Sequence, residues 1–319
     1  MTKHNMTNQA KFLMSLTALF ALTASMAVAS GAGTSGGQFL RVGVGARAAG
    51  MAGALSPIVD DPTAIYWNPA GLAMLEKREV SLSYNAYFVD TAQQFLGYGH
   101  PSKYGTFGVG ITMLSVGSIE KRSAASGDAD VPDGGEFNTQ DMAGALAWAN
   151  KFDLNAFAMH YGAALKFVSS DLDAASASTF AADLGVIAAH KASNLSFSLA
   201  VLNLGGELKF VDEGDPLPLN IKPGVGYRRD LGKMGKLNLA LDADILVNDG
   251  LTYVQPGVEW WFHKNFAFRT GWQLGRDSDA GVGFAAGLGM RKDAIGLDYA
   301  FVPFGGLGDT HRVSLAYRF

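Results

Sequence analysis

The sequence predicts an all-β protein, a 14-stranded antiparallel transmembrane β-barrel with an N-terminal, partly helical hatch, or plug. Three observations predict this fold. From about residue 79 to the C-terminus, apolar and polar residues alternate, as they do in strands that have one face in an apolar medium. The connections between these alternating segments are short at one predicted end and longer at the other. Residues 1–29 have the pattern of an export signal.

The export signal is the first element of the chain. Lys3 and Lys11 precede an apolar run over residues 12–22, and small residues at 27–29 fit a cleavage site. A membrane-spanning helix needs about 20 apolar residues, roughly twice the length of this run. We therefore expect a cleaved signal peptide, a mature chain that starts near Ser30, and a final location in the cell outer membrane.

The composition excludes several classes of protein. The chain has no cysteine, which excludes a lipoprotein anchor, a disulfide framework and a thiolate metal site. Its 40 glycines are too many for a helical protein. No later segment approaches the length of a transmembrane helix, so a chain that spans a membrane must do so as a closed barrel. The formal net charge of −4 argues against nucleic acid as a partner.

Residues 30–78 follow the signal and do not alternate, so we assign them to the hatch. Residues 43–54 are rich in Gly and Ala, which suits close packing in a confined space. Asp61 is expected to cap a short helix that has Pro62 at its first position, and Asn68-Pro69 repeats this start signal. The hatch is therefore expected to be a compact series of helical turns.

Residues 79–319 are assigned to the barrel and contain fourteen alternating segments. In the last segment, Val313, Leu315 and Tyr317 form an apolar row that ends in an aromatic residue, Phe319, as closing strands of outer-membrane barrels do. The segments begin near residues 80, 93, 106, 139, 156, 178, 195, 219, 236, 252, 265, 281, 294 and 312.

The connections between these segments differ in length and charge at the two predicted ends of the barrel. The even-numbered connections are short and hold nine Lys and Arg against three Asp and Glu. The odd-numbered ones include the two longest loops, residues 116–138 and 204–218, and hold sixteen Asp and Glu against four Lys and Arg. Short turns at one end and longer loops at the other are typical of outer-membrane barrels. A soluble β-sandwich is the alternative, but it would expose rows rich in Phe, Trp and Leu.

Five charged residues lie on the predicted polar rows of the strands: Asp242, Asp244, Glu259, Arg269 and Asp298. On the lipid face such residues would cost up to a few kcal/mol each, so we expect them to face a solvated lumen. Asp242 and Asp244 are expected to join a charge network with Arg269 or Arg228. The pair could also act as an acid/base couple, but no HExxH or GxSxG motif is present. We assign no catalytic residue and expect that the protein is not an enzyme.

Glycines form most of the predicted inner row of the twelfth strand, which is Gly281, Gly283, Ala285, Gly287 and Gly289. Glycine weakens a strand unless a bend or a close backbone approach requires it. We expect that the hatch packs against this row, with Gly283 and Gly287 in contact, or that the row leaves a side passage for an apolar ligand. General glycine richness is the alternative explanation.

An acidic segment at residues 128–136 has several carboxylates that could bind Ca²⁺. Its spacing departs from that of an EF-hand loop, and no flanking helices are expected, which favours a solvated acidic loop. Whether it binds Ca²⁺ stays open at this point. The sequence assigns no metal site and no cofactor.

Two stretches of the hatch resemble a known family. Residues 45–54 and 60–73 are similar to the N-terminal region of PorV/PorQ-type proteins, which belong to the superfamily of FadL-like long-chain fatty acid transporters. The most specific element is Asn68-Pro69-Ala70, which resembles the plug motif of the family. The resemblance implies a fourteen-stranded barrel closed by a hatch. It makes Arg47 and Asn68-Pro69-Ala70 candidates for the hatch or ligand site.

The resemblance implies two different functions. One is a transporter of hydrophobic small molecules that is gated by the hatch, with outer-membrane lipid and a long-chain hydrophobic ligand as partners. The other is an interaction or shuttle protein of type IX secretion, which binds secretion-system subunits or cargo. A transporter needs a continuous apolar pocket near the hatch, whereas an interaction protein needs long, ordered outer loops. The two longest loops are polar, which slightly disfavours a large docking surface.

Overall fold

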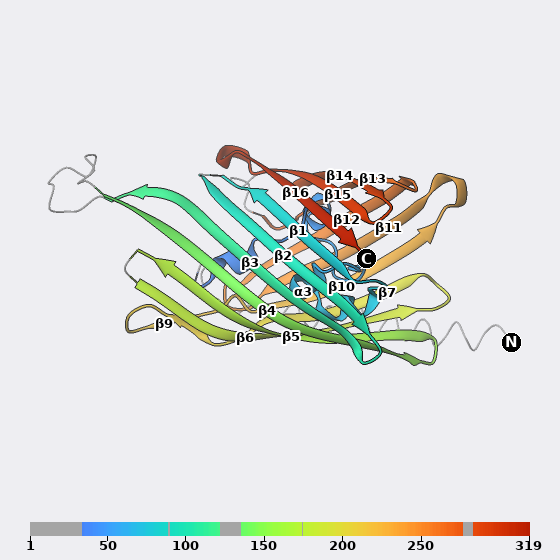
Figure 1. The fold of residues 1–319 in the computed structure, drawn as a ribbon, viewed down its shortest axis with the longest axis horizontal. Helices are drawn as coiled ribbons and strands as arrows, with labels where there is room; N and C mark the ends of the chain where they lie inside the picture. Colours follow the sequence, from blue (N-terminus) through green and yellow to red (C-terminus); the bar gives the residue numbers. More distant parts are fainter. Residues whose placement is uncertain (1–33, 89, 122–134, 174, 277–282) are drawn as a thin grey trace.

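The computed structural model describes residues 34–88, 90–121, 135–173, 175–276 and 283–319. Fourteen strands close into a barrel in which sequence neighbours pair and the last strand returns to the first (Figure 1). The predicted signal peptide and the predicted start near Ser30 lie outside the described residues. Within the described chain, no helix has both the length and the apolar character that a membrane span requires.

The predicted fourteen-stranded antiparallel barrel is confirmed, and each predicted segment corresponds to one barrel strand. Strand β1 pairs antiparallel with β16 from Glu79 opposite Arg318 to Ala86 opposite His311, which closes the barrel. The barrel strands are β1 (Glu79–Ala86), β2 (Thr91–Ser102), β3 (Gly105–Glu120), β4 (Glu136–Leu154), β5 (Phe157–Leu172), β6 (Ala175–His190), β7 (Leu195–Gly205), β10 (Asn220–Asp230), β11 (Lys236–Leu246), β12 (Leu251–His263), β13 (Phe266–Trp272), β14 (Phe284–Lys292), β15 (Ile295–Pro303) and β16 (Asp309–Arg318).

The apolar rows of the strands face outward. On β16, Val313, Leu315 and Tyr317 are exposed, while Arg312 and Ser314 between them are buried in the interior. The same alternation places the aromatic side chains of β13, among them Phe268, on the outside. An apolar, aromatic-rich outer surface on a closed sheet is what a bilayer requires, and it excludes the soluble sandwich.

The barrel wall is much taller on one side than on the other. Strands β3 to β6 have 16 to 19 residues, whereas β13 to β15 have 7 to 9. A tilted strand crosses a bilayer with about 9 to 11 residues. The tall side therefore extends beyond the membrane, and Figure 1 shows its green strands reaching past the red ones at the long-loop end.

The described part of the hatch, residues 34–78, lies inside the barrel (Figure 1, blue). It forms four short helical elements, η1 (Gln38–Arg41), α2 (Ala46–Gly50), α3 (Ala64–Trp67) and η2 (Pro69–Met74). Its apolar side chains, including Leu55, Ile58, Ile65 and Leu72, form one buried cluster with small inward-facing residues of the wall such as Ala147. The expectation of a solvated lumen is therefore wrong at this level of the barrel, because the hatch fills it.

The two predicted helix starts in the hatch have different outcomes. The side-chain oxygen of Asn68 accepts a hydrogen bond from the backbone N–H of Ala70, so Asn68 caps η2 as predicted. The other helix begins at Ala64, two residues after the predicted start at Pro62. The Asp61 carboxylate accepts the N–H of Thr63 instead, which holds this segment in a turn that precedes the helix.

The loop between β7 and β10 folds back over the hatch. It contains a two-stranded hairpin, β8 (Glu207–Lys209) and β9 (Gly214–Pro216), that is separate from the barrel. Leu208 and Leu217 are buried against Phe39 and Leu40 of the hatch. The predicted long loop at residues 204–218 is therefore a cover on the barrel mouth, although its composition is largely polar. The remaining short elements, η4 (Gly232–Met234) and η6 (Gly305–Leu307), lie in connections between strands.

Candidate functional site

Arg47 on α2 forms ion pairs with carboxylates of both the hatch and the barrel wall. Its side chain is only 7% exposed, and its Nη1 lies 2.5 Å from Asp60 Oδ1 and 2.9 Å from Asp61 Oδ2. On its other side, Arg47 donates through Nε and Nη2 to both carboxylate oxygens of Glu259 on β12, at 2.9 and 3.0 Å. This bidentate geometry is the strongest form of the arginine–carboxylate pair.

The ion pairs continue from Glu259 into the wall. Arg269 Nε donates to Glu259 at 2.7 Å, and its Nη1 donates to Asp298 at the same distance. Glu259 and Arg269 are fully buried. The predicted lumenal charges Glu259 and Arg269 thus face inward, but they pair with each other and with the hatch instead of with water.

The two hatch residues Arg47 and Asp60 in this network have pKa values that differ from the ordinary ones. Burial alone would raise the pKa of the Asp60 carboxyl, but the guanidinium groups of Arg47 and Arg228 outweigh it and hold that pKa below its ordinary value. Burial alone would lower the pKa of Arg47, and the carboxylates of Asp60, Glu259 and Asp61 raise it well above the ordinary arginine value. Both groups are therefore charged at neutral pH.

Asp242 and Asp244 take part in a second attachment of the hatch. Asp242 accepts the backbone N–H groups of Leu55 and Ser56 at 2.9 and 2.8 Å. Lys222 Nζ lies 2.9 Å from Asp244 and 3.7 Å from Asp242. The carboxylates thus face the interior, but their cationic partner is Lys222.

The prediction that Arg269 or Arg228 would be this partner is wrong. The register of β10 on β11 sets Gly224 opposite Asp242, which brings Lys222 beside both carboxylates. The cross-strand partner of Arg269 is Glu259. Lys222 was missed, although it lies on the inward row of β10 with Gly224 and Gly226. The alternating pattern shows that these two consecutive strands are neighbours, but it does not show their register or which inward side chains come into contact.

The plug motif Asn68-Pro69-Ala70 seats the hatch against the tall side of the wall. Asn68 is fully buried and donates to Ser56 Oγ at 3.2 Å. A Cβ atom added to Gly185 would lie 2.0 Å from Asn68 Oδ1, and one added to Gly162 would lie 2.6 Å from the carbonyl carbon of Pro69. Glycines on β5 and β6 thus provide the room that the motif occupies.

The two predicted glycines of the twelfth strand have different roles. A Cβ added to Gly50 of the hatch would lie 3.1 Å from the Cα of Gly287, so the two backbones approach closely there. Gly283 lies before β14 with φ +74°, and a Cβ on it would lie 2.2 Å from the carbonyl oxygen of Gln273. Gly283 therefore lies close to the backbone of Gln273, and it also lines the cavity described next, together with hatch residues such as Gly53. Its role in hatch contact or in a ligand passage stays a prediction. Gly281 lies outside the described residues.

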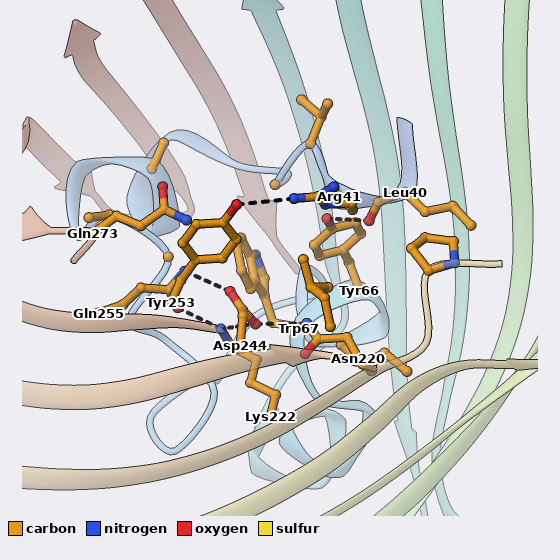
Figure 2. A pocket seen from close by; sticks show the side chains of 18 of the residues that line it. Leu40, Arg41, Tyr66, Trp67, Asn220, Lys222, Asp244, Tyr253, Gln255 and Gln273 are labelled. Atoms are coloured by element: carbon orange, nitrogen blue, oxygen red, sulfur yellow. Dashed lines mark hydrogen bonds and ion pairs between the residues drawn. The ribbon is translucent and has the colours of Figure 1, made fainter. Parts of the chain in front are cut away.

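A cavity of about 340 Å³ lies between the hatch and the long-loop mouth (Figure 2). Aromatic side chains form one part of its lining: Tyr66, Trp67, Tyr87, Tyr253 and Phe304. Charged side chains form another part: Arg41, Lys166, Lys222, Arg276, Arg312 and a single carboxylate, Asp244. The cavity is thus aromatic and cationic, and its lining is not continuously apolar.

Arg312 is the cavity cation with unused binding capacity. Arg312 as a whole residue is 8% exposed to solvent, and its Nη1 donates to the carbonyl oxygen of Gly43 at 2.8 Å. Within the described chain, its buried Nε has no hydrogen-bond partner and no carboxylate lies within ion-pair distance of it. Other cavity cations have carboxylate partners, as Lys166 has in Asp183 at 2.7 Å. A buried, uncompensated guanidinium is costly unless an anion joins it.

The structure brings no group of three or more metal-ligating side chains together among the residues it describes. The acidic segment predicted as a possible Ca²⁺ loop, residues 128–136, lies almost entirely outside those residues, which include only its last two.

These features define a class of protein: an outer-membrane β-barrel that is closed from inside by an N-terminal hatch held by buried ion pairs. The family model described as "Type IX secretion system protein PorV" matches residues 26–249. The chain belongs to this family. None of the curated proteins compared with it matches significantly.

Solved structures with the same fold include two hydrocarbon transporters. The toluene transporter TbuX of Ralstonia pickettii superposes with a TM-score of 0.61 at 12% identity, covering 87% of this chain and 98% of that one. The P. putida toluene transporter TodX gives a TM-score of 0.57 at 11% identity, covering 87% and 99%. At such identities the likeness establishes the FadL-type fold alone.

Proposed function

We propose that the protein is an outer-membrane transporter that binds a small amphipathic molecule in the cavity above the hatch. The molecule would be apolar with an anionic head group, and movement of the hatch would admit it. The observation that carries this proposal is Arg312, a buried cation that faces a cavity lined with aromatic rings and has no carboxylate partner among the described residues. Most of the cavity cations are otherwise engaged, so the head group has one defined position to occupy.

The mixed lining narrows the ligand class. A wholly apolar ligand would displace water from the Arg312 guanidinium without supplying an anion, which is unfavourable. An amphipath would place its head group on Arg312 and its apolar part against Trp67 and Tyr253, which both line the cavity (Figure 2). The same fold in hydrocarbon transporters is consistent with the passage of apolar molecules.

Ligand titration of the purified full chain in detergent tests this proposal, with tryptophan fluorescence as the readout. Dodecanoate should bind more tightly than dodecanol, which has the same apolar chain and no charge. Arg312→Gln should weaken dodecanoate binding about tenfold or more, because a hydrogen bond to a charged group contributes about 1.5–3 kcal/mol. Dodecanol binding should not change.

Lys292→Gln is the matched control, because Lys292 is exposed at the end of β14 and outside the cavity. It removes the same charge and should leave the binding of both ligands unchanged. Equal dodecanoate affinity in the wild type and the Arg312→Gln variant would contradict the proposal.

A second candidate function is an interaction role in type IX secretion, which the description of the matched family names. The tall side of the wall favours it, since β3 to β6 extend beyond the membrane and could present a surface to partner subunits or cargo. Purification from native membranes separates the two functions. Recovery of secretion subunits with the chain would favour this candidate, and recovery of amphipathic lipid alone would favour the transporter.

A further inference from the structure

A second cavity, of about 870 Å³, lies at the opposite mouth, where the short turns are. We call it the basal basin. Seven Lys and Arg line it against three Asp and Glu, in a chain whose formal net charge is −4. Its cations are Arg47, Arg228, Arg229, Lys233, Lys236, Lys264 and Arg291. A concave surface with such an excess of one charge concentrates ligands of the opposite charge.

The cations come from separate parts of the fold that the barrel brings together. Arg228, Lys236 and Arg291 lie on the inward rows of β10, β11 and β14. Lys233 and Lys264 are on the short turns that form the rim. The basin therefore lies at the mouth of the barrel, and its cations on β10, β11 and β14 face the barrel interior.

Arg291 is positioned by an aromatic ring and has no carboxylate within ion-pair distance among the described residues. Its guanidinium lies 4.7 Å from the centre of the Trp261 ring, which fixes its position inside the basin. The lining carboxylates have other partners: Glu259 is bound to Arg47 and Arg269, Asp60 to Arg47 and Arg228, and Asp230 accepts the backbone N–H of Gly232.

Arg228 connects the basin to the hatch. Its guanidinium donates to the carbonyl oxygen of Ile58 and lies 3.3 Å from Asp60 Oδ2. The side chains of Arg228 and Asp60 are 39% and 31% exposed, so solutes can reach both from the basin. Asp60 thus occupies a position in which another carboxylate could replace it.

We propose that the basal basin binds an acidic polypeptide segment and that this binding loosens the hatch. Carboxylates of the segment would pair with Arg291 and compete with Asp60 for Arg228. Short turns face the periplasm in outer-membrane barrels, so the segment belongs to a periplasmic partner. A peptide fits better than a lipid head group because Arg228 and Arg291, the cations that would bind it, lie on inward rows and not on the lipid-facing surface. The proposal does not depend on the transporter function.

Binding is tested with a fluorescent oligoglutamate peptide and the full chain in detergent, by anisotropy at low ionic strength. The double variant Arg228→Gln/Arg291→Gln should weaken binding about tenfold or more, because it removes two charge-assisted contacts. The matched control Lys103→Gln/Lys151→Gln removes two exposed charges near the same end but outside the basin, and it should bind as the wild type does. Equal losses in both variants would overturn the site. Displacement of the peptide by phosphatidylglycerol vesicles at the same residues would assign the basin to lipid instead.

Loosening of the hatch is tested with Ser56→Cys, because Ser56 is fully buried and the chain has no other cysteine. Peptide should increase the rate at which a maleimide modifies this cysteine. Arg291→Gln leaves the contacts of Arg228 with the hatch in place, so it should keep the basal rate and reduce the response to peptide. Binding of peptide without any change in the rate would overturn the proposed coupling.

Discussion

At the scale of single residues, Arg47 determines how firmly the hatch is held. It joins two hatch carboxylates to Glu259 of the wall; Arg47, Asp61 and Glu259 are largely withdrawn from water, whereas Asp60 is partly exposed. Such a network does not necessarily stabilise the fold more than apolar packing would, but removing one member leaves its partners buried without compensation. We therefore expect the network to specify where the hatch sits.

Arg47→Ala should lower the free energy of unfolding by about 3–5 kcal/mol, because it leaves the buried Glu259 with one cation instead of two. Urea unfolding in lipid vesicles, followed by tryptophan fluorescence, measures this change. Lys292→Ala, at an exposed position, should change the same quantity by no more than about 0.5 kcal/mol. A similarly small effect of Arg47→Ala would show that packing alone holds the hatch.

Asp60 makes the seating of the hatch depend on pH. Its folded-state pKa is lowered, so its contribution to stability is complete above the unfolded value of about 3.9 and is lost as the pH falls below that value. The measurement is the protection of the Ser56→Cys thiol from a thiol reagent that still reacts in acid. This protection should be constant between about pH 7 and 5 and should decline below about pH 4. In an Asp60→Asn background this decline should be smaller. An unchanged decline would assign it to other carboxylates.

At the scale of elements, close contact between α2 and β14 depends on two glycines that face each other. A Cβ added to Gly287 would lie 3.1 Å from the Cα of Gly50 and 2.9 Å from the carbonyl oxygen of Tyr299. Helix α2 therefore cannot keep its position if a side chain is placed on that part of the strand. The attachment is steric here, whereas at Arg47 it is electrostatic.

Gly287→Leu should displace α2 and open a leak along β14, because the new side chain occupies the space of the Gly50 backbone. Single-channel recording in planar bilayers should show higher conductance than in the wild type. Gly144→Leu is the control, since nothing lies within 4 Å of a Cβ at Gly144. Equal conductance of the Gly287→Leu variant and the wild type, with both folded, would contradict this role.

At the scale of the whole molecule, we expect the hatch to decide whether the barrel conducts. Eight strands leave a lumen that side chains can fill and sixteen to eighteen leave an open channel, so fourteen strands require an additional plug. The buried cluster of hatch and wall residues provides it. The wild type should therefore conduct poorly.

Deletion of residues 34–75 should convert the barrel into an open pore with large, steady conductance steps in planar bilayers. The strand ladder and the outer apolar surface do not involve these residues, so the barrel should still form. Heat-modifiable migration in gel electrophoresis and a β-type far-UV spectrum check that it has folded. A folded deletion variant that conducts no better than the wild type would show that the loops, and not the hatch, close the barrel.

The sequence by itself determined the strands, their number and which of their faces meets lipid. These features follow from the two-residue period of each strand, which is a local property, as in the row from Val313 to Tyr317. The cap at Asn68 was likewise readable, since it depends on a hydrogen bond to a residue two positions away.

Only the tertiary structure decided what the inward rows contact. Lys222 beside Asp244 depends on the register of two neighbouring strands. Arg47 between Asp60 and Glu259 depends on how the hatch enters the barrel, and so does the Arg312 Nε, which has no hydrogen-bond partner among the described residues. The alternating pattern of the sequence is identical whether an inward polar residue contacts water, a counter-ion or a ligand. The burial that distinguishes these cases exists only once the barrel has closed around the hatch.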